Sequence, residues 1–453
     1  MNIIKIIRTS LVPSQIRSSK IIKSILGLSM LKVLSMAFGL VLIPMTLGYL
    51  GPVKYGVWLT LGSIVGWAGF FDLGLSNGLR NKLGEALAKD DIQLAKSLVS
   101  TTLIMLSGIG GFIYLIFWLI NPLLNWLEIL NAPASMAVEL HLVVIIVFSF
   151  FTLRFISGLI ITVLMTDQRP ALADSISTAG TFLSLMIIYF LTMTTKGSLI
   201  YVGIAFSAST VLVPLLAGVW FFTRSYRKIS PSFSYVDFSL FKSLSGQGLH
   251  FFGIQLAALV LFSTDNIIIA QIFGPEEVVP YNIAYKLFSY VVMAFGVVMT
   301  PFWAVYNEAY NKHDLLWIKR TTNKMLGIWA GLVIGVVILF LLSGNIFQVW
   351  LGDQIAVPTS ISFFMAINVI VQTFNMIFVT FVFSTGKLRI QIYTALIAAL
   401  INIPLSYLFA KVLGLGPAGV ILATAVCGAP NLFLSPIQYH KLIHERAQGI
   451  WDK

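Results

Sequence analysis

A single arginine, Arg154, interrupts a long apolar stretch of this 453-residue chain. Arg154 lies about 15 residues into the apolar run 139–166, within the sequence Phe-Ser-Phe-Phe-Thr-Leu-Arg-Phe. A charge at the centre of a bilayer costs roughly 2.5–3.5 kcal/mol on insertion scales, so such residues tend to mark a substrate or ion pathway. Snorkelling from this depth would require a reach of more than about 10 Å. We therefore favour a cavity-facing, substrate-binding role for Arg154 over a structural ion pair.

Other ionisable residues lie within or at the borders of apolar runs. The basic candidates for substrate binding are Lys32, Arg80 and Lys286, and the acidic candidates for ion coupling or ion pairing are Asp72, Asp174 and Asp265. Lys32 could equally snorkel to the surface. Between Asp265 and Lys286, on neighbouring runs, an ion pair is slightly favoured over a substrate contact. An interfacial position is an equally simple explanation of Asp72 and Asp174, and the balanced charges do not predict a strongly cationic cavity.

A polar stripe follows one face of the run 359–384. Asn368, Gln372 and Asn375 are spaced i, i+4 and i+7, which places them on the same side of a helix. Asn402, in a later run, adds hydrogen-bonding capacity. The stripe suits either contacts to a sugar or hydrogen bonds between helices, and the spacing does not separate the two interpretations.

Sequence motifs for enzymatic chemistry are missing. The chain contains no GxxxxGK[ST] phosphate-binding loop and no HExxH metal motif. Its lone cysteine, Cys427, excludes an intrachain disulfide, and His440 and His444 lack a third metal ligand. We therefore expect no catalytic residues, no metal and no cofactor.

The elements that must position these residues are membrane-spanning helices. Hydrophobic residues make up 58% of the chain, charged residues only 10%, and mean hydropathy is +0.92. Runs of about 20 apolar residues are long enough to cross a bilayer as helices. We predict twelve spans: 25–49, 55–79, 98–120, 139–166, 171–193, 199–223, 246–273, 279–303, 324–347, 359–384, 390–411 and 417–439. We expect the charged stretch 81–97 to form a surface helix that turns Leu83, Leu87 and Leu94 toward lipid headgroups.

The net charge of +12 is a topology signal and does not predict nucleic-acid binding. Only Lys54, Lys196 and Lys411 fall on the side opposite the N-terminus, Arg154 and Lys286 lie within spans, and the other 24 of the 29 basic residues share the N-terminal side. This asymmetry is typical of bacterial inner-membrane proteins and places both termini in the cytoplasm. Residues 1–24 are expected to be a basic segment on the cytoplasmic surface.

The chain repeats itself at an offset of 223 residues. Gly51-Pro52 recurs as Gly274-Pro275, and Glu85-Ala86, Lys89, Asp91 and Lys96 recur as Glu308-Ala309, Lys312, Asp314 and Lys319. Such a repeat is typical of transporters whose substrate path runs between two halves. We predict an all-α polytopic membrane protein with two six-helix lobes, related by a pseudo-two-fold axis along the membrane normal. The N-lobe would span 25–223 and the C-lobe 246–439, with a cytoplasmic linker at 224–245 and a tail at 440–453.

Two stretches give the chain a family resemblance. Residues 47–58, Leu-Gly-Tyr-Leu-Gly-Pro-Val-Lys-Tyr-Gly-Val-Trp, precede residues 70–86, Phe-Phe-Asp-Leu-Gly-Leu-Ser-Asn-Gly-Leu-Arg-Asn-Lys-Leu-Gly-Glu-Ala. Together they resemble the polysaccharide transporter family, the O-antigen flippases of Wzx type. That family belongs to the superfamily of multidrug, oligosaccharidyl-lipid and polysaccharide exporters.

The resemblance implies a flippase for lipopolysaccharide biosynthesis. It implies movement of an undecaprenyl-diphosphate-linked oligosaccharide to the outer leaflet by alternating access of the lobes. Arg154 would then receive the diphosphate as a charge-assisted partner, and Asp72 and Asp174 could carry coupling protons or ions. Membrane lipids, a polysaccharide polymerase and a chain-length regulator are the partners it implies.

Two rival functions fit the sequence less well. A drug or cation extruder of the same fold should present uncompensated acids within the membrane, and Lys32 and Arg154 work against this. A membrane-embedded polysaccharide polymerase should carry catalytic groups in a large outer loop. The largest predicted outer loop, 121–138, offers only Glu128 as a charged residue.

Overall fold

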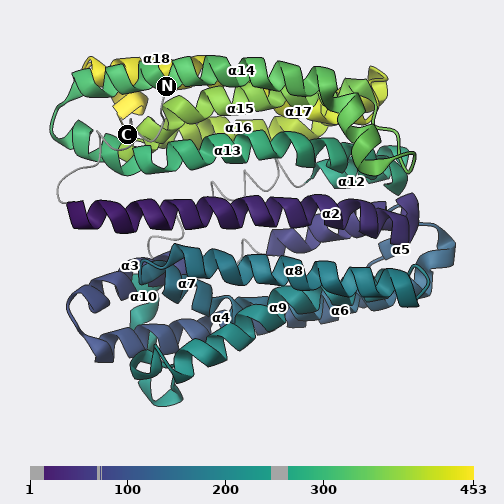
Figure 1. Cartoon of the computed structure of the whole chain (residues 1–453), viewed down its shortest axis with the longest axis horizontal. Coiled ribbons are helices and arrows are strands. Elements are labelled where there is room, and N and C mark those ends of the chain that lie inside the picture. The colour runs from purple at the N-terminus through teal and green to yellow at the C-terminus, as the bar shows by residue number, and fades with distance from the viewer. Residues whose placement is uncertain (1–14, 69–71, 73, 246–263, 453) are drawn as a thin grey trace. The chain divides into compact units, whose positions relative to one another are not determined.

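The protein is an all-α, multi-pass membrane protein. The computed structural model describes residues 15–68, 72, 74–245 and 264–452, and in these ranges the chain forms helices and connecting turns without strands (Figure 1). Helices dominate because each spanning segment must satisfy its own backbone hydrogen bonds in lipid. Ten helical segments of the described residues are long and apolar enough to cross a membrane.

The helices follow one another with short connections. In chain order they are α2 (Gln15–Ala68), α3 (Leu75–Ala88), α4 (Ile92–Ile120), α5 (Trp126–Ile129), α6 (Ala137–Ser157), α7 (Leu159–Thr166), α8 (Pro170–Thr194), α9 (Leu199–Thr223), α10 (Phe241–Ser245), α12 (Asp265–Phe273), α13 (Val278–Asn311), α14 (Leu315–Leu351), α15 (Thr359–Thr385), α16 (Arg389–Tyr407), α17 (Pro417–Gly428) and α18 (Asn431–Ile443). The chain divides into two compact units. The first comprises Met1–Met45, Phe71–Pro122 and Leu142–Leu249, and the second comprises Thr46–Phe70, Leu123–His141 and His250–Lys453.

The ten candidate spans are consistent with the twelve predicted runs. The candidate span Met30–Trp67 contains most of the first predicted run and about half of the second, because α2 continues across a kink at Gly51. The seventh predicted run, 246–273, lies largely outside the described residues, and only α12 at its end is seen. Of the basic segment predicted at 1–24, residues 1–14 lie outside the described part and the remainder begins α2.

Both copies of the repeated Gly-Pro dipeptide adopt the same backbone conformation. Gly51 has φ 73° and ψ 165°, and Gly274 has φ 103° and ψ 159°. Glycine adopts these positive φ angles without the steric penalty of a side chain, and the following proline favours the extended ψ. The repeat therefore extends from sequence to backbone geometry.

The repeated charged stretch also forms the same turn twice. Asp91 accepts a hydrogen bond from the backbone N–H of Leu94 and caps α4, and Asp314 caps α14 by accepting from Trp317. Such side-chain caps satisfy N–H groups that the first helical turn leaves open. The expectation of one surface helix at 81–97 is wrong, because α3 ends at Ala88 and α4 begins at Ile92, although Leu94 is exposed as expected. Leu83 is fully buried on α3, which packs along α4, because the helices continue beyond the predicted spans and join in a tight turn.

The core of the first unit is built from leucines and valines of several helices. Buried residues of α3, α4, α7 and the segment after α9 pack in one cluster that includes Leu79, Leu98, Val163 and Ile229. The core of the second unit is aromatic instead. Tyr306 and Phe381 pack edge to face, with ring centroids 5.7 Å apart, in a cluster of α13, α14, α15 and α18.

Several predicted spans are interrupted helices. The second predicted run, 55–79, is not continuous, because Gly74 adopts a left-handed conformation with φ 73° directly before α3 begins at Leu75. The fourth run divides at Gly158 into α6 and α7, and the twelfth divides at Ala429-Pro430 into α17 and α18. A π-helical turn, Leu408–Val412, ends the eleventh. At Gly158, Ala429 and Pro430 the backbone keeps right-handed helical angles, so the chain continues along a helical path through both divisions. Membrane helices tolerate such local losses of backbone hydrogen bonding where other protein groups satisfy the freed backbone.

Candidate functional site

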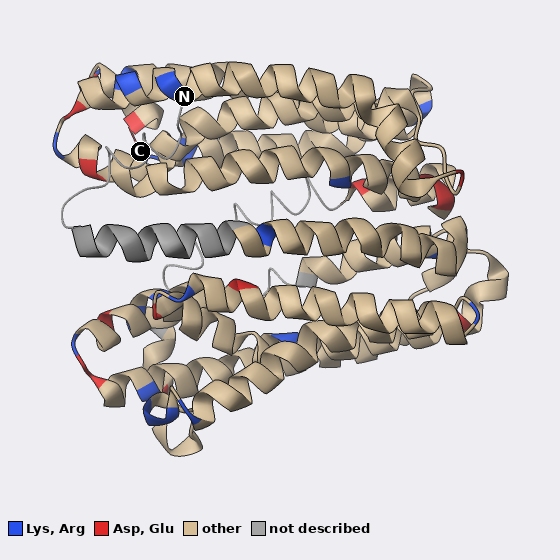
Figure 2. Cartoon of the chain, viewed as in Figure 1, with Lys and Arg blue, Asp and Glu red and all other residues tan. Residues whose placement is uncertain are grey.

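Charged residues concentrate at the ends of the helices and in the turns, and few lie along the helix lengths (Figure 2). This distribution follows from the cost of placing charge in hydrocarbon. The exceptions include Lys32 along α2 and Lys286 along α13.

Arg154 lies in the last turn of α6, immediately before the break to α7. Its side chain is exposed and is not sealed inside the helices of the first unit. Among the residues that the structure describes, no carboxylate lies within 4 Å of its guanidinium group. The carbonyl oxygen of Arg154 accepts a hydrogen bond from the N–H of Gly158 at 2.9 Å, so helical hydrogen bonding continues past the charge. Arg154 is therefore available to a ligand.

Asp72 lies between α2 and α3, at the interruption of the second run. It is half-buried and its Oδ1 atom accepts a hydrogen bond from the N–H of Gly74 at 2.8 Å. Gly74 begins α3 with φ 73°, a conformation that glycine adopts readily. Arg80 is exposed two turns into α3. Asp72 thus stabilises a helix start, which does not prevent its other oxygen from binding a ligand.

Lys32 and Asp174 belong to separate helices of the first unit. Lys32 is half-buried on α2, and Asp174 is half-buried near the start of α8. The backbone carbonyl of Asp174 accepts a hydrogen bond from the hydroxyl of Thr178 at 2.8 Å. Neither charged group forms an ion pair with a described residue.

Asp265 is the most buried of the predicted acidic residues. It begins α12 with 6% of its surface exposed, and its Oδ2 atom accepts a hydrogen bond from the hydroxyl of Tyr281 on α13. Its other oxygen, Oδ1, has no hydrogen-bond partner in the described structure. A buried carboxylate with an open oxygen is costly unless it is protonated or binds a cation.

A second open oxygen belongs to the same part of the second unit. Asn402 on α16 is fully buried and donates to the hydroxyl of Thr424 on α17 at 3.1 Å, whereas its Oδ1 atom has no partner. Helix α12 packs against α16 and α17, so the carboxylate and the amide oxygen belong to helices that contact one another.

The expected ion pair between Asp265 and Lys286 is not formed. Asp265 instead binds Tyr281, and the ammonium group of half-buried Lys286 lies 5.6 Å from the ring centre of Tyr290, one turn along α13. The physical reason is that Tyr281, one turn before Lys286, occupies the carboxylate. Sequence spacing alone cannot detect this competition.

The polar stripe of α15 turns partly into the helix bundle. Asn368 is buried, Gln372 is half-buried, and the amide of Asn375 donates to the carbonyl oxygen of Gly428 on α17 at 3.3 Å. At Asn375 the interhelical interpretation of the stripe therefore holds.

Sequence reasoning missed the neutral polar residues that surround Asp265. Asn266 and Asn282 exchange hydrogen bonds between α12 and α13, and Asn266 also donates to Ser63 at 2.7 Å. Asparagines within apolar runs could have identified these residues, but the prediction was based mainly on charged residues.

The connections at the ends of the helices form their own polar network. The hydroxyl of Tyr226 donates to Asp167 at 2.6 Å, and burial together with this carboxylate raises the pKa of Tyr226 above its ordinary value.

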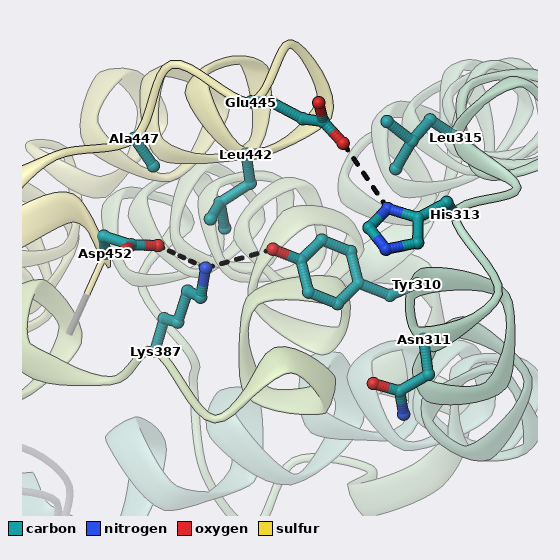
Figure 3. A pocket seen from close by; sticks show the side chains of 9 residues that line it. All are labelled: Tyr310, Asn311, His313, Leu315, Lys387, Leu442, Glu445, Ala447 and Asp452. Carbon is teal, nitrogen blue, oxygen red and sulfur yellow. Dashed lines mark hydrogen bonds and ion pairs between the residues drawn. The ribbon is translucent and has the colours of Figure 1, made fainter.

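In the second unit a pocket of about 310 Å³ lies beside Tyr310, Lys387 and Glu445 (Figure 3). Lys387 bonds both Asp452 and the Tyr310 hydroxyl. Burial alone would lower the pKa of Lys387, but these two partners raise it.

These residues fasten the tail and do not form a metal site. The Nδ1 atom of His313 lies 3.4 Å from a carboxylate oxygen of Glu445, and Lys387 pairs with Asp452. These two contacts join the C-terminal tail to the turn between α13 and α14 and to the turn between α15 and α16. Across the described ranges, no group of three or more histidine, cysteine or acidic side chains could hold a metal ion.

Sequence comparison identifies relatives over most of the chain. A family model described as "Polysaccharide biosynthesis protein" matches residues 21–306. A protein of Salmonella typhimurium named "Putative O-antigen transporter" is 24% identical over 407 residues, which cover 86% of this chain and 89% of that protein. A protein of Yersinia pseudotuberculosis named "Putative O-antigen export protein" is 24% identical over 358 residues, which cover 77% of this chain and 79% of that protein.

Structural comparison identifies the same fold in solved transporters. One structure, described as the inward-facing conformation of a multidrug resistance MATE family transporter of the MOP superfamily, gives a TM-score of 0.73 at 14% identity and covers 92% of this chain and 98% of that chain. The outward-facing conformation of such a transporter gives a TM-score of 0.65 at 15% identity and covers 93% and 96%. At these identities the likeness shows the fold alone.

Proposed function

Because the chain belongs to the family of polysaccharide biosynthesis proteins, we propose that it is a flippase for a lipid-linked oligosaccharide. Its substrate is an undecaprenyl-diphosphate-linked repeat unit of O-antigen or a related polysaccharide. The protein moves the sugar and diphosphate from the cytoplasmic to the outer leaflet, while the lipid tail stays in the bilayer. The names of the relatives from Salmonella typhimurium and Yersinia pseudotuberculosis support this substrate class.

The state of Arg154 is the observation that carries the proposal. The guanidinium group is exposed, lies near the middle of an apolar run, and has no acidic partner among the described residues. A planar guanidinium group can bind a phosphate through two parallel hydrogen bonds. Placing an unpaired arginine within the membrane costs free energy, and binding of a negatively charged ligand would offset that cost.

Alternating access of two lobes provides the transport step. In this mechanism the cavity opens first to the cytoplasm, accepts the diphosphate and sugar, and then opens to the other side as the lobes rock. With the cytoplasm negative, each negative charge that leaves it gains up to about 2.3 kcal/mol per 100 mV. The membrane potential therefore favours export of a diphosphate.

Asp265 is the candidate for coupling transport to an ion. Its open Oδ1 atom and the open Oδ1 atom of Asn402 are oxygen ligands of the kind that a proton or a hard monovalent cation requires. Asp72 and Asp174 are weaker candidates, because both are only half-buried and ionisation costs them less. A polysaccharide polymerase and a chain-length regulator are the proteins that would use the exported unit.

Reconstitution tests the proposed function. Purified protein in liposomes should expose a fluorescent undecaprenyl-diphosphate oligosaccharide to an external lectin or glycosidase faster than empty liposomes do. A parallel experiment with a cationic dye tests the drug-extrusion alternative, since the solved structures of similar fold come from multidrug transporters. Dye transport without movement of the lipid-linked sugar would overturn the proposal.

A further inference from the structure

The segment between α9 and α10 is firmly attached to the first unit. Tyr226 and Ile229 are buried in the core, and the Tyr226 hydroxyl donates to Asp167. Farther on, Leu244 is fully buried, and its backbone approaches Gly78 so closely that a Cβ atom there would overlap the Leu244 carbonyl group. The segment therefore has a defined position against α3 and α4.

Hydrogen bonds place this segment beside the entry of α4 into the membrane. The N–H of Ser232 donates to the hydroxyl of Ser100 at 3.0 Å, and the N–H of Asp237 donates to the hydroxyl of Thr101 at 2.9 Å. Both acceptors lie just inside the run 98–120, which the sequence predicts as the third span. The segment thus runs at the level where hydrocarbon gives way to headgroups.

The anchored segment turns large apolar side chains outward. Phe233 is 85% exposed, Phe238 is 66% exposed and Phe241 is 49% exposed. Three exposed phenylalanines within nine residues are unusual for a loop in water, because large apolar side chains are usually buried in the protein core. At the border of a membrane, the same exposure allows each ring to enter the lipid.

Basic residues accompany the phenylalanines. Arg224, Arg227 and Lys228 are exposed, and Asp237 is the only acidic residue of 224–245. Figure 2 shows basic residues gathered where α9 ends and in the turns that follow. Arg224 lies 3.6 Å from the ring centre of Trp220, itself largely exposed near the end of α9. Tryptophan beside arginine at a helix end is typical of a membrane interface.

We propose that this linker surface, formed by Phe233, Phe238 and Phe241 with Arg224, Arg227 and Lys228, binds anionic phospholipid headgroups of the adjacent leaflet. The phenylalanines insert among the acyl chains, and the basic residues bind the phosphates. Positive charge beside apolar side chains fits an anionic lipid better than a zwitterionic one. The inference depends on the position of the segment beside α4 and is independent of the transported substrate.

Site-directed fluorescence tests this proposal. In full-length protein carrying Cys427→Ser, Ser234→Cys is labelled with an environment-sensitive fluorophore and placed in nanodiscs of phosphatidylcholine alone or mixed with phosphatidylglycerol. Ser234 is exposed and adjoins Phe233, so the label reports on the surface without removing a phenylalanine. We expect blue-shifted emission and quenching by nitroxide lipids, both stronger with phosphatidylglycerol and weakened by salt.

Matched variants separate the two contributions. Phe233→Ser with Phe238→Ser should return the emission to its value in water, whereas Arg224→Gln, Arg227→Gln and Lys228→Gln together should remove the preference for phosphatidylglycerol. Lys312→Cys, in an exposed turn of the second unit, provides a label that should remain in water. Water-like emission at position 234 in both lipids would overturn the proposal. Equal blue shifts in the two lipids would overturn the recognition of anionic headgroups.

Discussion

At the scale of single residues, two charged groups distinguish this protein from an inert helical bundle. Arg154 is exposed and unpaired among the described residues, whereas Asp265 is buried with one oxygen open. The first state suits a ligand that arrives with negative charge, and the second suits a small cation or proton that enters a confined site. The two residues therefore carry different predictions.

Replacement of Arg154 should reduce transport of the lipid-linked sugar. Arg154→Ala removes a charge-assisted hydrogen-bonding partner worth roughly 1.5–3 kcal/mol, so the initial rate should fall about 10- to 100-fold. Arg154→Lys retains the charge without the planar fork and should keep part of the rate. Rates are measured in proteoliposomes with equal amounts of protein, and exposed Lys312→Ala serves as the control. An Ala variant within twofold of the wild type would remove Arg154 from the substrate path.

Replacement of Asp265 should uncouple transport from an ion gradient. Asp265→Asn keeps the shape of the side chain but cannot ionise or exchange a proton, so acceleration by an imposed proton or sodium gradient should disappear. The rate without a gradient should remain. Asp353→Asn, on an exposed turn after α14, is the matched control. An Asn variant that still responds to both gradients would show that the coupling group lies elsewhere.

At the scale of elements, the sequence predicts helices well and their interruptions poorly. Apolar runs identify the spans, because hydrocarbon thickness and backbone hydrogen bonding leave few alternatives. The breaks at Asp72, Gly158 and Pro430 lie inside such runs, where only one of the three positions is a proline. Tertiary contacts determine where an apolar helix stops, and hydropathy does not contain that information. The missed pairing of Asp265 with Tyr281 has the same origin, because their separation of 16 residues has no helical periodicity.

A glycine in α3 offers a test of these tertiary contacts. Gly78→Ala would place a Cβ atom against the backbone of Leu244, so α10 must shift, at a cost of about 1–3 kcal/mol. The thermal unfolding midpoint of the purified protein should fall by several degrees. Gly108→Ala on α4 meets no atom within 4 Å and should leave the midpoint unchanged or slightly higher. Equal midpoints for both variants would show that α10 does not pack against α3 in the membrane.

At the scale of the whole molecule, the distribution of basic residues predicts which ends of the helices face the cytoplasm. The spans themselves were predictable from composition, and the fold of the solved transporters supports this architecture. The grouping of the helices into two units cannot be derived from hydropathy, because hydropathy identifies spans and contains no information on which spans pack together. The lobe boundaries and their pseudo-two-fold axis therefore remain predictions.

Accessibility of introduced cysteines tests the predicted orientation. In a Cys427→Ser background, Lys196→Cys in a predicted outer turn should react with a membrane-impermeant thiol reagent added to intact cells. Lys312→Cys in a predicted cytoplasmic turn should react only after permeabilisation. The opposite pattern would invert the topology and place both termini outside.

The matching torsion angles of Gly51 and Gly274 also have an evolutionary consequence. Gene duplication followed by divergence produces such a pattern, since flanking residues drift while a turn that needs glycine remains. On this account, the two copies derive from one shorter ancestral unit. After fusion into one polypeptide, the two copies could mutate independently, so that Arg154 could arise in one copy and the buried Asp265 in the other.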